Sequence, residues 1–172
     1  MRCRGLQYSL AHMTVGESLT DLAELVPDQA ILLDLDTADR DALIRAMADA
    51  LAEAGIVDRD YAERCIARER ENPTGLVTTG GSIALPHADP RAGEQMGVAI
   101  ARPTTPVEFD AMADEGTVQA RIVFLLAVAG GETHLEALAE VIDIVQDPER
   151  MSGLLAAATP EEVKRLLRRD SR

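Results

Sequence analysis

The segment Pro73–Pro90, with the sequence PTGLVTTGGSIALPHADP, decides the fold because the periodicity of the chain changes across it. The residues before it recur mainly at helical spacing, whereas those after it form apolar, β-branched runs bounded by glycine and proline. Near its end, Pro86 has a fixed φ and keeps Leu85 extended by steric pressure. We therefore expect a short strand to end abruptly there and to hold His87 at the edge of a sheet.

The apolar spacing on both sides of this segment predicts helices and strands in a definite order. Asp147-Pro148 and Thr159-Pro160 each predict a helix start, and Thr159 with Glu162 forms a capping box. Strands in the middle of the chain with helices on both sides predict an α/β fold, a three-layer α/β/α sandwich with a central mixed β-sheet flanked by helices. In chain order, the predicted elements are a short helix at 19–26, a strand at 30–35, a helix capped by Asp36 or Thr37 and ending near Ala54, a helix at 61–71, strands at 82–86, 95–103 and 120–128, a helix at 132–146 with an apolar stripe Leu135/Leu138/Ile142, and two helices after Pro148 and Pro160.

The length and composition indicate one globular domain with an aliphatic core. The chain has 172 residues, of which 47% are apolar, 27% charged and only 2% aromatic. We expect a folded domain at residues 19–172 and an N-terminal extension at residues 1–18 outside it, with Met13 as an alternative translation start. The two cysteines, Cys3 and Cys65, form no CxxC pair, which favours a reducing, cytoplasmic location, with Cys65 in the core.

The charge and hydropathy of the chain argue against two classes of partner. A formal net charge of −13 repels phosphate backbones and anionic lipid headgroups, and few aromatic rings are present for base stacking. The longest apolar run, residues 122–129, is far shorter than the roughly 20 residues that span a bilayer. We therefore predict no nucleic-acid partner and no direct membrane insertion.

The residues around His87 fit a site for a phosphate or phosphoryl group. Gly75, Gly80 and Gly81 lack a Cβ, so their backbone can approach a ligand closely and form an anion-binding nest. Thr74 and Ser82 add hydroxyl donors, and we predict that all five residues bind phosphate.

Several roles for His87 follow from the local pattern. It could be a general base, a metal ligand, a phosphoryl acceptor or a structural residue. No HxH, HExxH or cysteine pair lies nearby, so we predict no metal site, and no GxSxG elbow supplies an acyl-transfer nucleophile.

Three motifs resemble one family. Residues Ile83–Ala88 match an apolar-Ala-apolar-Pro-His motif, Arg68-Glu69 precedes Thr74-Gly75 at a characteristic spacing, and His134-Leu135 opens the helix after the last strand. Together they resemble the fructose/mannitol-type enzyme IIA domain of the phosphoenolpyruvate-dependent sugar phosphotransferase system, over nearly the whole chain. The loop from Gly75 to His87 is longer than in the common fructose and mannitol forms, which looks more like the galactitol-type branch.

The resemblance implies a phosphoryl relay without a cofactor. Phospho-HPr would donate its phosphoryl group to Nε2 of His87, which would pass it to a cysteine of enzyme IIB, the partner of the membrane enzyme IIC. By the same resemblance, His134 is a second active-site histidine. Arg68, with Arg70 as the alternative, would pair with the phosphoryl oxygens. Glu69 and Asp89 are close to the site in sequence; either could orient a histidine or belong to the acidic surface, and we favour the surface.

Other functions remain open from the sequence. The nitrogen-type branch of the same superfamily would use His87 to report its phosphorylation state by binding other proteins, without transporting a sugar. A pure interaction domain with an inert His87 is a third class. An apolar rim that includes Leu76, Val77 and Met112 is expected to dock the partner protein.

Overall fold

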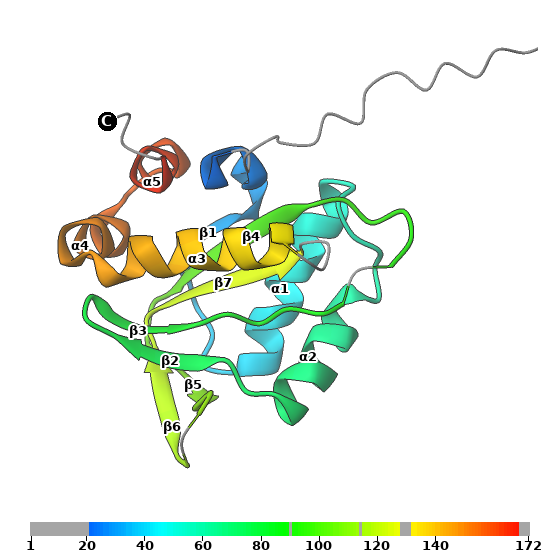
Figure 1. Cartoon of the computed structure of the whole chain (residues 1–172), viewed down its shortest axis with the longest axis horizontal. Helices are drawn as coiled ribbons and strands as arrows, with labels where there is room; N and C mark the ends of the chain where they lie inside the picture. The colour runs from blue at the N-terminus through cyan, green and yellow to red at the C-terminus, as the bar shows by residue number, and fades with distance from the viewer. Residues whose placement is uncertain (1–20, 90, 114, 128–131, 169–172) are drawn as a thin grey trace, which may run out of the picture.

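The computed structural model describes residues 21–89, 91–113, 115–127 and 132–168. The predicted N-terminal extension, Leu19 at the start of the first predicted helix and Val128 at the end of the last predicted strand lie outside these ranges. Within them the chain forms a central sheet with helices packed on both faces (Figure 1). The predicted three-layer α/β/α sandwich is confirmed.

The central sheet has five strands in the order β1-β4-β7-β3-β2. The β1/β4 and β3/β7 pairs are parallel, and the β4/β7 and β2/β3 pairs are antiparallel, so the sheet is mixed as predicted. All six residues of β7 are buried, as expected for a strand covered on both faces. The strands are β1 (Ile31–Leu35), β2 (Gly75–Thr78), β3 (Gly81–Ala84), β4 (Gly97–Pro103) and β7 (Ile122–Ala127).

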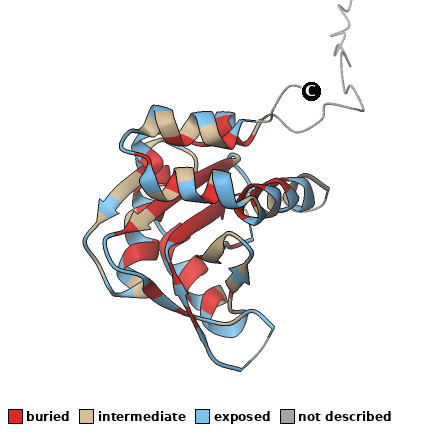
Figure 2. Ribbon diagram, turned by 90° about the vertical axis from the view of Figure 1, so that its left-hand side faces the viewer, coloured by how far each residue is buried: buried red, intermediate tan, exposed pale blue. Residues whose placement is uncertain are grey.

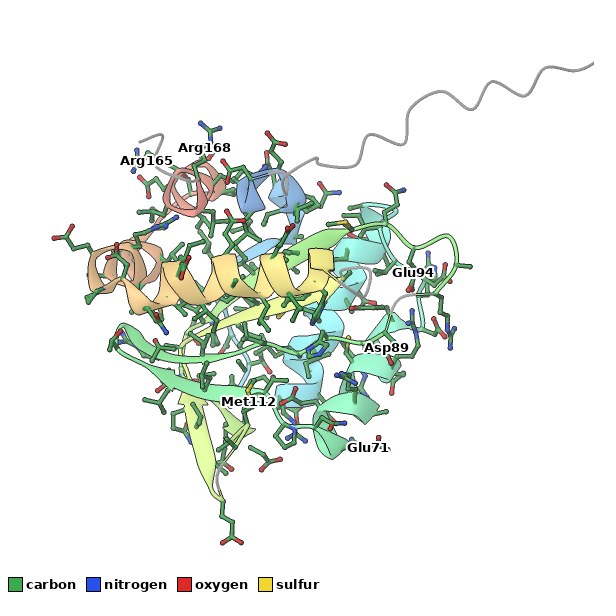
Figure 3. The ribbon with its side chains drawn as sticks, in the orientation of Figure 1. Glu71, Asp89, Glu94, Met112, Arg165 and Arg168 are labelled. Carbon is green, nitrogen blue, oxygen red and sulfur yellow. The ribbon has the colours of Figure 1, made fainter. Side chains whose placement is uncertain are left out.

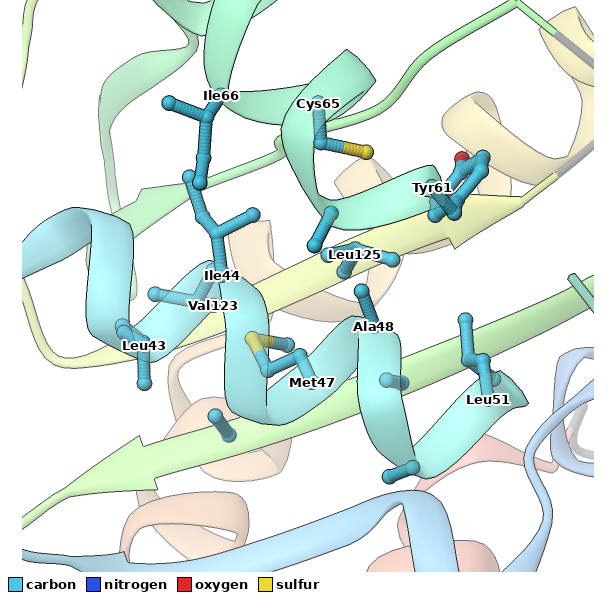
Figure 4. Close-up of a cluster of buried hydrophobic side chains, with 14 of the residues drawn as sticks. Leu43, Ile44, Met47, Ala48, Leu51, Tyr61, Cys65, Ile66, Val123 and Leu125 are labelled. Carbon is cyan, nitrogen blue, oxygen red and sulfur yellow. The ribbon is translucent and has the colours of Figure 1, made fainter. Parts of the chain in front are cut away.

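Two helical layers cover the two faces of this sheet, and alternate strand residues point to each (Figure 2). On β7, Val123 and Leu125 face α1 and α2, as Figure 4 shows, whereas Phe124 and Leu126 face the other layer. The first layer consists of α1 (Arg40–Glu53) and α2 (Tyr61–Glu71), and the second of α3 (Glu132–Gln146), α4 (Pro148–Ala156), α5 (Pro160–Leu167) and the 3-10 helix η1 (Leu22–Leu25). The short 3-10 helix η2 (Asp28–Ala30) leads into β1 and contacts α1.

One part of the core agrees with the prediction, and another differs from it. Cys65 is buried, as predicted. Leu135, placed in the core stripe of α3 by the sequence, is 65% exposed, because the buried face of α3 is formed by Ala137, Val141, Ile144 and Val145 instead. The other two residues of the predicted stripe, Leu138 and Ile142, are partly buried and pack against this core, so the prediction is wrong at Leu135.

Helix starts follow the predicted caps at two of three positions. The side chain of Asp147 caps α4, and Thr159 Oγ1 accepts the Glu162 N–H at 3.3 Å at the start of α5. The predicted cap of α1 at Asp36 or Thr37 is wrong, because Asp39 accepts the Ala42 N–H at 2.6 Å and the helix begins at Arg40.

Three short strands were not predicted. Besides β2, a separate ribbon forms from β5 (Val107–Asp110) and β6 (Thr117–Ala120), which pair antiparallel. Their burial alternates residue by residue, and each strand has only four residues, so neither makes a continuous apolar run. Ala120, predicted to begin the last core strand, belongs to β6 instead.

Candidate functional site

His87 lies just beyond β3, where the chain runs beside the end of β7. The residue makes an isolated parallel bridge with Leu126, and the Leu126 N–H donates to the carbonyl oxygen of Pro86 at 3.0 Å. The prediction that Pro86 ends the strand and leaves His87 at its edge agrees with this placement, since β3 ends at Ala84. The imidazole is half-buried rather than fully enclosed.

A backbone contact assigns the tautomer of His87. Its Nδ1 lies 2.9 Å from the carbonyl oxygen of Leu85. A carbonyl oxygen only accepts, so we assign the proton to Nδ1 and the free lone pair to Nε2. The neutral ring therefore presents Nε2 as a nucleophile.

The surroundings keep this ring neutral. Burial lowers the pKa of His87 below its ordinary value of 6.5, and the charges of Arg68 and His134 lower it further. The hydrogen bond to Leu85 and the charge of Asp89 raise the pKa of His87, but they do not reverse the shift. At neutral pH the imidazole is therefore uncharged.

His134 and Arg68 come to His87 from opposite helical layers. The rings of His87 and His134, in the first turn of α3, have centroids 5.2 Å apart and planes tilted by 47°. Arg68, on α2, lines an open pocket of about 310 Å³ whose wall also includes Ala88, next to His87. Asp89 and Glu71, which line the same pocket, lie on the α2 side of the molecule (Figure 3). The structure thus brings His87, His134 and Arg68 to one place.

Arg68 forms no ion pair within the described ranges, whereas the guanidinium of Arg70 is paired. The buried Nε of Arg68 has no hydrogen-bond partner among the described residues. Arg70 forms an ion pair with Asp41 of α1. The two arginines are two positions apart on a helix and so point to different sides, and Arg68 is the one whose charge acts on His87.

Thr74 and Glu69 form a buried pair close behind His87. Thr74 donates its N–H to Glu69 Oε1 at 2.8 Å and its hydroxyl to Glu69 Oε2 at 2.7 Å. The Leu85 N–H in turn donates to Thr74 Oγ1 at 3.0 Å. The expectation that Glu69 lies on the surface is wrong, since it is 1% exposed, whereas Asp89 is exposed as expected. Thr74 is itself buried, so its hydroxyl faces Glu69 and Leu85.

Tyr61 was not singled out from the sequence, yet it holds the other side of the histidine. Its hydroxyl donates to the carbonyl oxygen of Leu126 at 2.7 Å and accepts the Ala88 N–H at 3.3 Å. Burial raises the pKa of Tyr61 well above its usual range, so the phenol stays protonated and can donate. A tyrosine at the start of a charged helix carries no sequence pattern that points to this role.

The remaining predicted phosphate-binding residues lie along the β2–β3 hairpin. Gly75 pairs with Ala84 at the end near His87, and an added Cβ would meet the Asp110 backbone oxygen at 2.6 Å. Gly80, Gly81 and Ser82 lie at the turn end, about 16 to 23 Å along an extended chain from His87 at roughly 3.3 Å per residue. The structure does not bring these three residues to the histidine.

Two further properties of the described ranges bear on the site. No helix in them is long and apolar enough to cross a membrane. No group of three or more histidine, cysteine, aspartate or glutamate side chains in the same ranges is arranged to hold a metal ion.

The site therefore combines an imidazole whose Nε2 lone pair is free, a second imidazole and an arginine without an ion-pair partner in the described ranges. The chain matches the family model of the phosphoenolpyruvate-dependent sugar phosphotransferase system, EIIA 2, over residues 24–170. It therefore belongs to this family of phosphotransferase components.

Individual relatives support this membership. The chain is 33% identical over 153 residues to the fructose-specific EIIA component of Haloferax volcanii, covering 87% of this chain and 96% of that protein. It is 26% identical over 117 residues to the galactitol-specific EIIA component of Escherichia coli, covering 68% and 78%. The crystal structure of the nitrogen regulatory protein IIA-Ntr from Neisseria meningitidis superposes with a TM-score of 0.70 at 26% identity, covering 85% and 98%.

These identities do not favour the galactitol-type branch that the loop length suggested. The fructose-specific relative is both more similar and more completely covered than the galactitol-specific one. The loop that suggested this branch contains the turn of the β2–β3 hairpin, between Thr78 and Gly81, which lies away from His87.

Proposed function

We propose that this chain is the enzyme IIA component of a cytoplasmic phosphoryl relay that drives the uptake and phosphorylation of a sugar. In this proposal Nε2 of His87 attacks the phosphorus of phospho-HPr, and the bond from phosphorus to the HPr histidine breaks. The phosphoryl group then passes to a cysteine of enzyme IIB, which serves the membrane enzyme IIC. The observation that carries the proposal is the Nδ1 contact of His87 with Leu85, which leaves Nε2 free.

The neighbouring groups suit the charge that moves through the site. Phosphoryl transfer passes through a loose transition state with negative charge on the equatorial oxygens, so catalysis requires positioning and donors. We assign Arg68 and His134 to these oxygens, because both lie beside His87 and neither has an ion pair within the described ranges. Gly75 pairs with Ala84 at this end of the β2–β3 hairpin, close to His87.

A partner protein that exchanges a phosphoryl group with His87 has to bind the surface around it. Met112 and Leu135 are large apolar side chains that are 46% and 65% exposed, and Leu135 directly follows His134. We assign them to the rim that docks HPr and IIB in turn. Val77 of β2, which was also predicted for this rim, is exposed as well.

The direct test is phosphoryl uptake from phosphoenolpyruvate in the presence of enzyme I and HPr. The wild-type chain should take up one acid-labile label, and His87→Ala should take up none. Labelling of the His87→Ala variant to the wild-type level, or an acid-stable label, would contradict the proposal.

A regulatory role is the second candidate, supported by the likeness to the nitrogen regulatory protein of Neisseria meningitidis. Both roles use the same phosphohistidine, so His87→Ala cannot separate them. Transfer of the label onward to the cysteine of a fructose-type IIB protein favours sugar transport. Labelled chain that no IIB protein discharges favours regulation, and reading frames for IIB and IIC beside the gene would favour transport.

A further inference from the structure

Three hydrogen bonds connect the buried carboxylate of Glu69 to the imidazole of His87. Thr74 Oγ1 lies 2.7 Å from Glu69 Oε2, and the Leu85 nitrogen lies 3.0 Å from Thr74 Oγ1. The carbonyl oxygen of Leu85 then lies 2.9 Å from Nδ1 of His87. A continuous path of polar contacts thus runs from the interior face of α2 to the reactive ring.

The chemistry of the groups fixes the direction of each bond. A carboxylate only accepts, so the single hydroxyl proton of Thr74 points to Glu69. The hydroxyl oxygen is then free to accept the Leu85 N–H. The second oxygen of Glu69 accepts the Thr74 N–H at 2.8 Å, which holds the threonine backbone as well. Every contact of Thr74 with Glu69 and Leu85 therefore has one donor and one acceptor.

The backbone on the other side of Leu85 is also held. Pro86 has no N–H, and its carbonyl oxygen accepts the Leu126 N–H at 3.0 Å. The Thr74 hydroxyl thus holds the peptide group before Leu85, and the β7 backbone holds the peptide group after Pro86. The peptide group between them, which carries the Leu85 carbonyl, is therefore held from both ends. The direction of the Leu85 carbonyl, and with it the proton on Nδ1, depends on this pair of contacts.

We infer that Glu69 and Thr74 are positioning residues for phosphoryl transfer, which fix Leu85 and thereby the Nδ1–H tautomer and orientation of His87. This inference rests on the proposed role of His87 as phosphoryl acceptor. A requirement for stability alone explains the pair poorly, because a well-packed apolar pair at a buried site is often at least as stabilising as buried polar groups. Neither side chain touches the reacting atoms, so both act through Leu85.

Thr74→Val is the sharpest single change, because it keeps the shape of the side chain and removes only the hydroxyl. We expect the tautomer population of His87, measured by nitrogen NMR on the wild-type and variant chains above the imidazole pKa, to shift away from Nδ1–H. The rate of phosphoryl uptake from phospho-HPr should fall about 10- to 100-fold, as is typical when a supporting hydrogen-bond partner is removed. Thr74→Ser keeps the hydroxyl and should restore both measurements.

A matched control exists in the same strand. Thr78 lies on β2, and its hydroxyl contacts the carbonyl oxygens of Gly81 and Val145, far from His87. Thr78→Val removes the same group from the same hairpin. It should leave the His87 tautomer and the rate of phosphoryl uptake unchanged.

Glu69→Gln tests the other member of the pair without changing its size. The amide oxygen of glutamine accepts a hydrogen bond, whereas its NH₂ group only donates. In either orientation the NH₂ group therefore faces one of the two Thr74 donors, the N–H or the hydroxyl. We expect the tautomer and rate effects of Thr74→Val to recur. The double variant should be no slower than the slower single variant, because both changes break one path.

The outcomes separate this inference from the proposed function. If wild-type chain is not labelled on His87, the proposed function fails first. If it is labelled, and Thr74→Val keeps its rate within about twofold or its tautomer unchanged, the inference fails alone. A Thr74→Ser variant as slow as Thr74→Val also overturns it. Should Thr74→Val not fold, Glu69→Gln is scored by the same two measurements.

Discussion

The two ends of the β2–β3 hairpin both place a threonine hydroxyl close to a glycine, but the hydroxyls have different partners. Near His87, Thr74 bonds Glu69 and Leu85 inside the protein. At the turn, the Thr78 and Thr79 hydroxyls contact the carbonyl oxygens of Val145 and Gln146 at the end of α3. One end supports the backbone that contacts His87, and the other contacts the C-terminal end of α3.

α3 repeats this contrast at its own two ends. Its first turn carries His134 beside His87, and its last residues receive the hydroxyls of the hairpin turn. A helix of 15 residues is about 22 Å long, so its first turn beside His87 and its last residues at the hairpin turn lie far apart. Both hairpin ends carry threonines, so residue type alone does not distinguish them. The partners of the threonine hydroxyls do.

The strongest test of this contrast compares two arginines of α2. We expect Arg68→Ala to slow phosphoryl uptake about 100-fold or more, the cost of losing one preorganised donor to a developing charge. Arg70→Ala, its matched control, breaks the ion pair with Asp41 at the surface and should leave uptake within about twofold. The measurement is the initial rate with phospho-HPr. Equal losses in the two variants would remove Arg68 from the site.

His134→Ala should have a smaller effect on the same rate. Removing one donor to a charged group costs about 1.5–3 kcal/mol, which corresponds to roughly a tenfold to hundredfold slower transfer. The fold should persist, because His134 is only partly buried at a helix start. Circular dichroism and a thermal melt check the fold. Wild-type kinetics in a folded His134→Ala variant would show that the ring contact with His87 has no role in transfer.

At the turn end the prediction is the reverse, a loss of stability without a loss of activity. A Cβ on Gly80 would collide with the backbone oxygen of Val145 and approach Met151 Cβ to 2.9 Å. Gly80→Ala should therefore lower the free energy of unfolding by about 1–3 kcal/mol, as overpacking does. Urea denaturation measures this loss. The folded variant should accept phosphoryl groups at the wild-type rate, and a rate defect there would extend the site to the turn.

Long, continuous patterns in the sequence predicted most of the fold. The helical stripes, the fully apolar β7 and the caps at Asp147 and Thr159 each depend on residues close together in the chain. The ribbon of β5 and β6 could not be predicted in this way, because its strands have only four residues each and carry charged or polar residues on their exposed face. Such strands are specified by the partner they pair with.

The site was predictable where the chain itself restricts the backbone, as at Pro86 and His87. It was not predictable where a role depends on distant partners. The glycine at position 80 is explained by Met151 and Val145, which are remote in sequence. Glu69 lies among charged helix residues, and only the fold brings Thr74 and Leu85 into contact with it. Local composition therefore singled out the histidine, but it could not show that Gly80 packs against α3 and α4.

The smallest expected effect is the contribution of His87 to the pH dependence of the free energy of unfolding. Burial holds the pKa of His87 below 6.5 in the folded state, whereas the unfolded chain has the ordinary value. As the pH falls below 6.5, the unfolded state takes up a proton that the folded state does not, so the free energy of unfolding decreases. This loss is complete once the pH lies below the folded pKa. Urea midpoints of wild type and His87→Gln at pH 7.5 and at acidic pH should therefore diverge, with the wild type losing more stability on acidification. Parallel losses in the two proteins would mean that His87 is as solvated as an exposed histidine, and the lone pair on Nε2 would then be protonated over a wider range of pH.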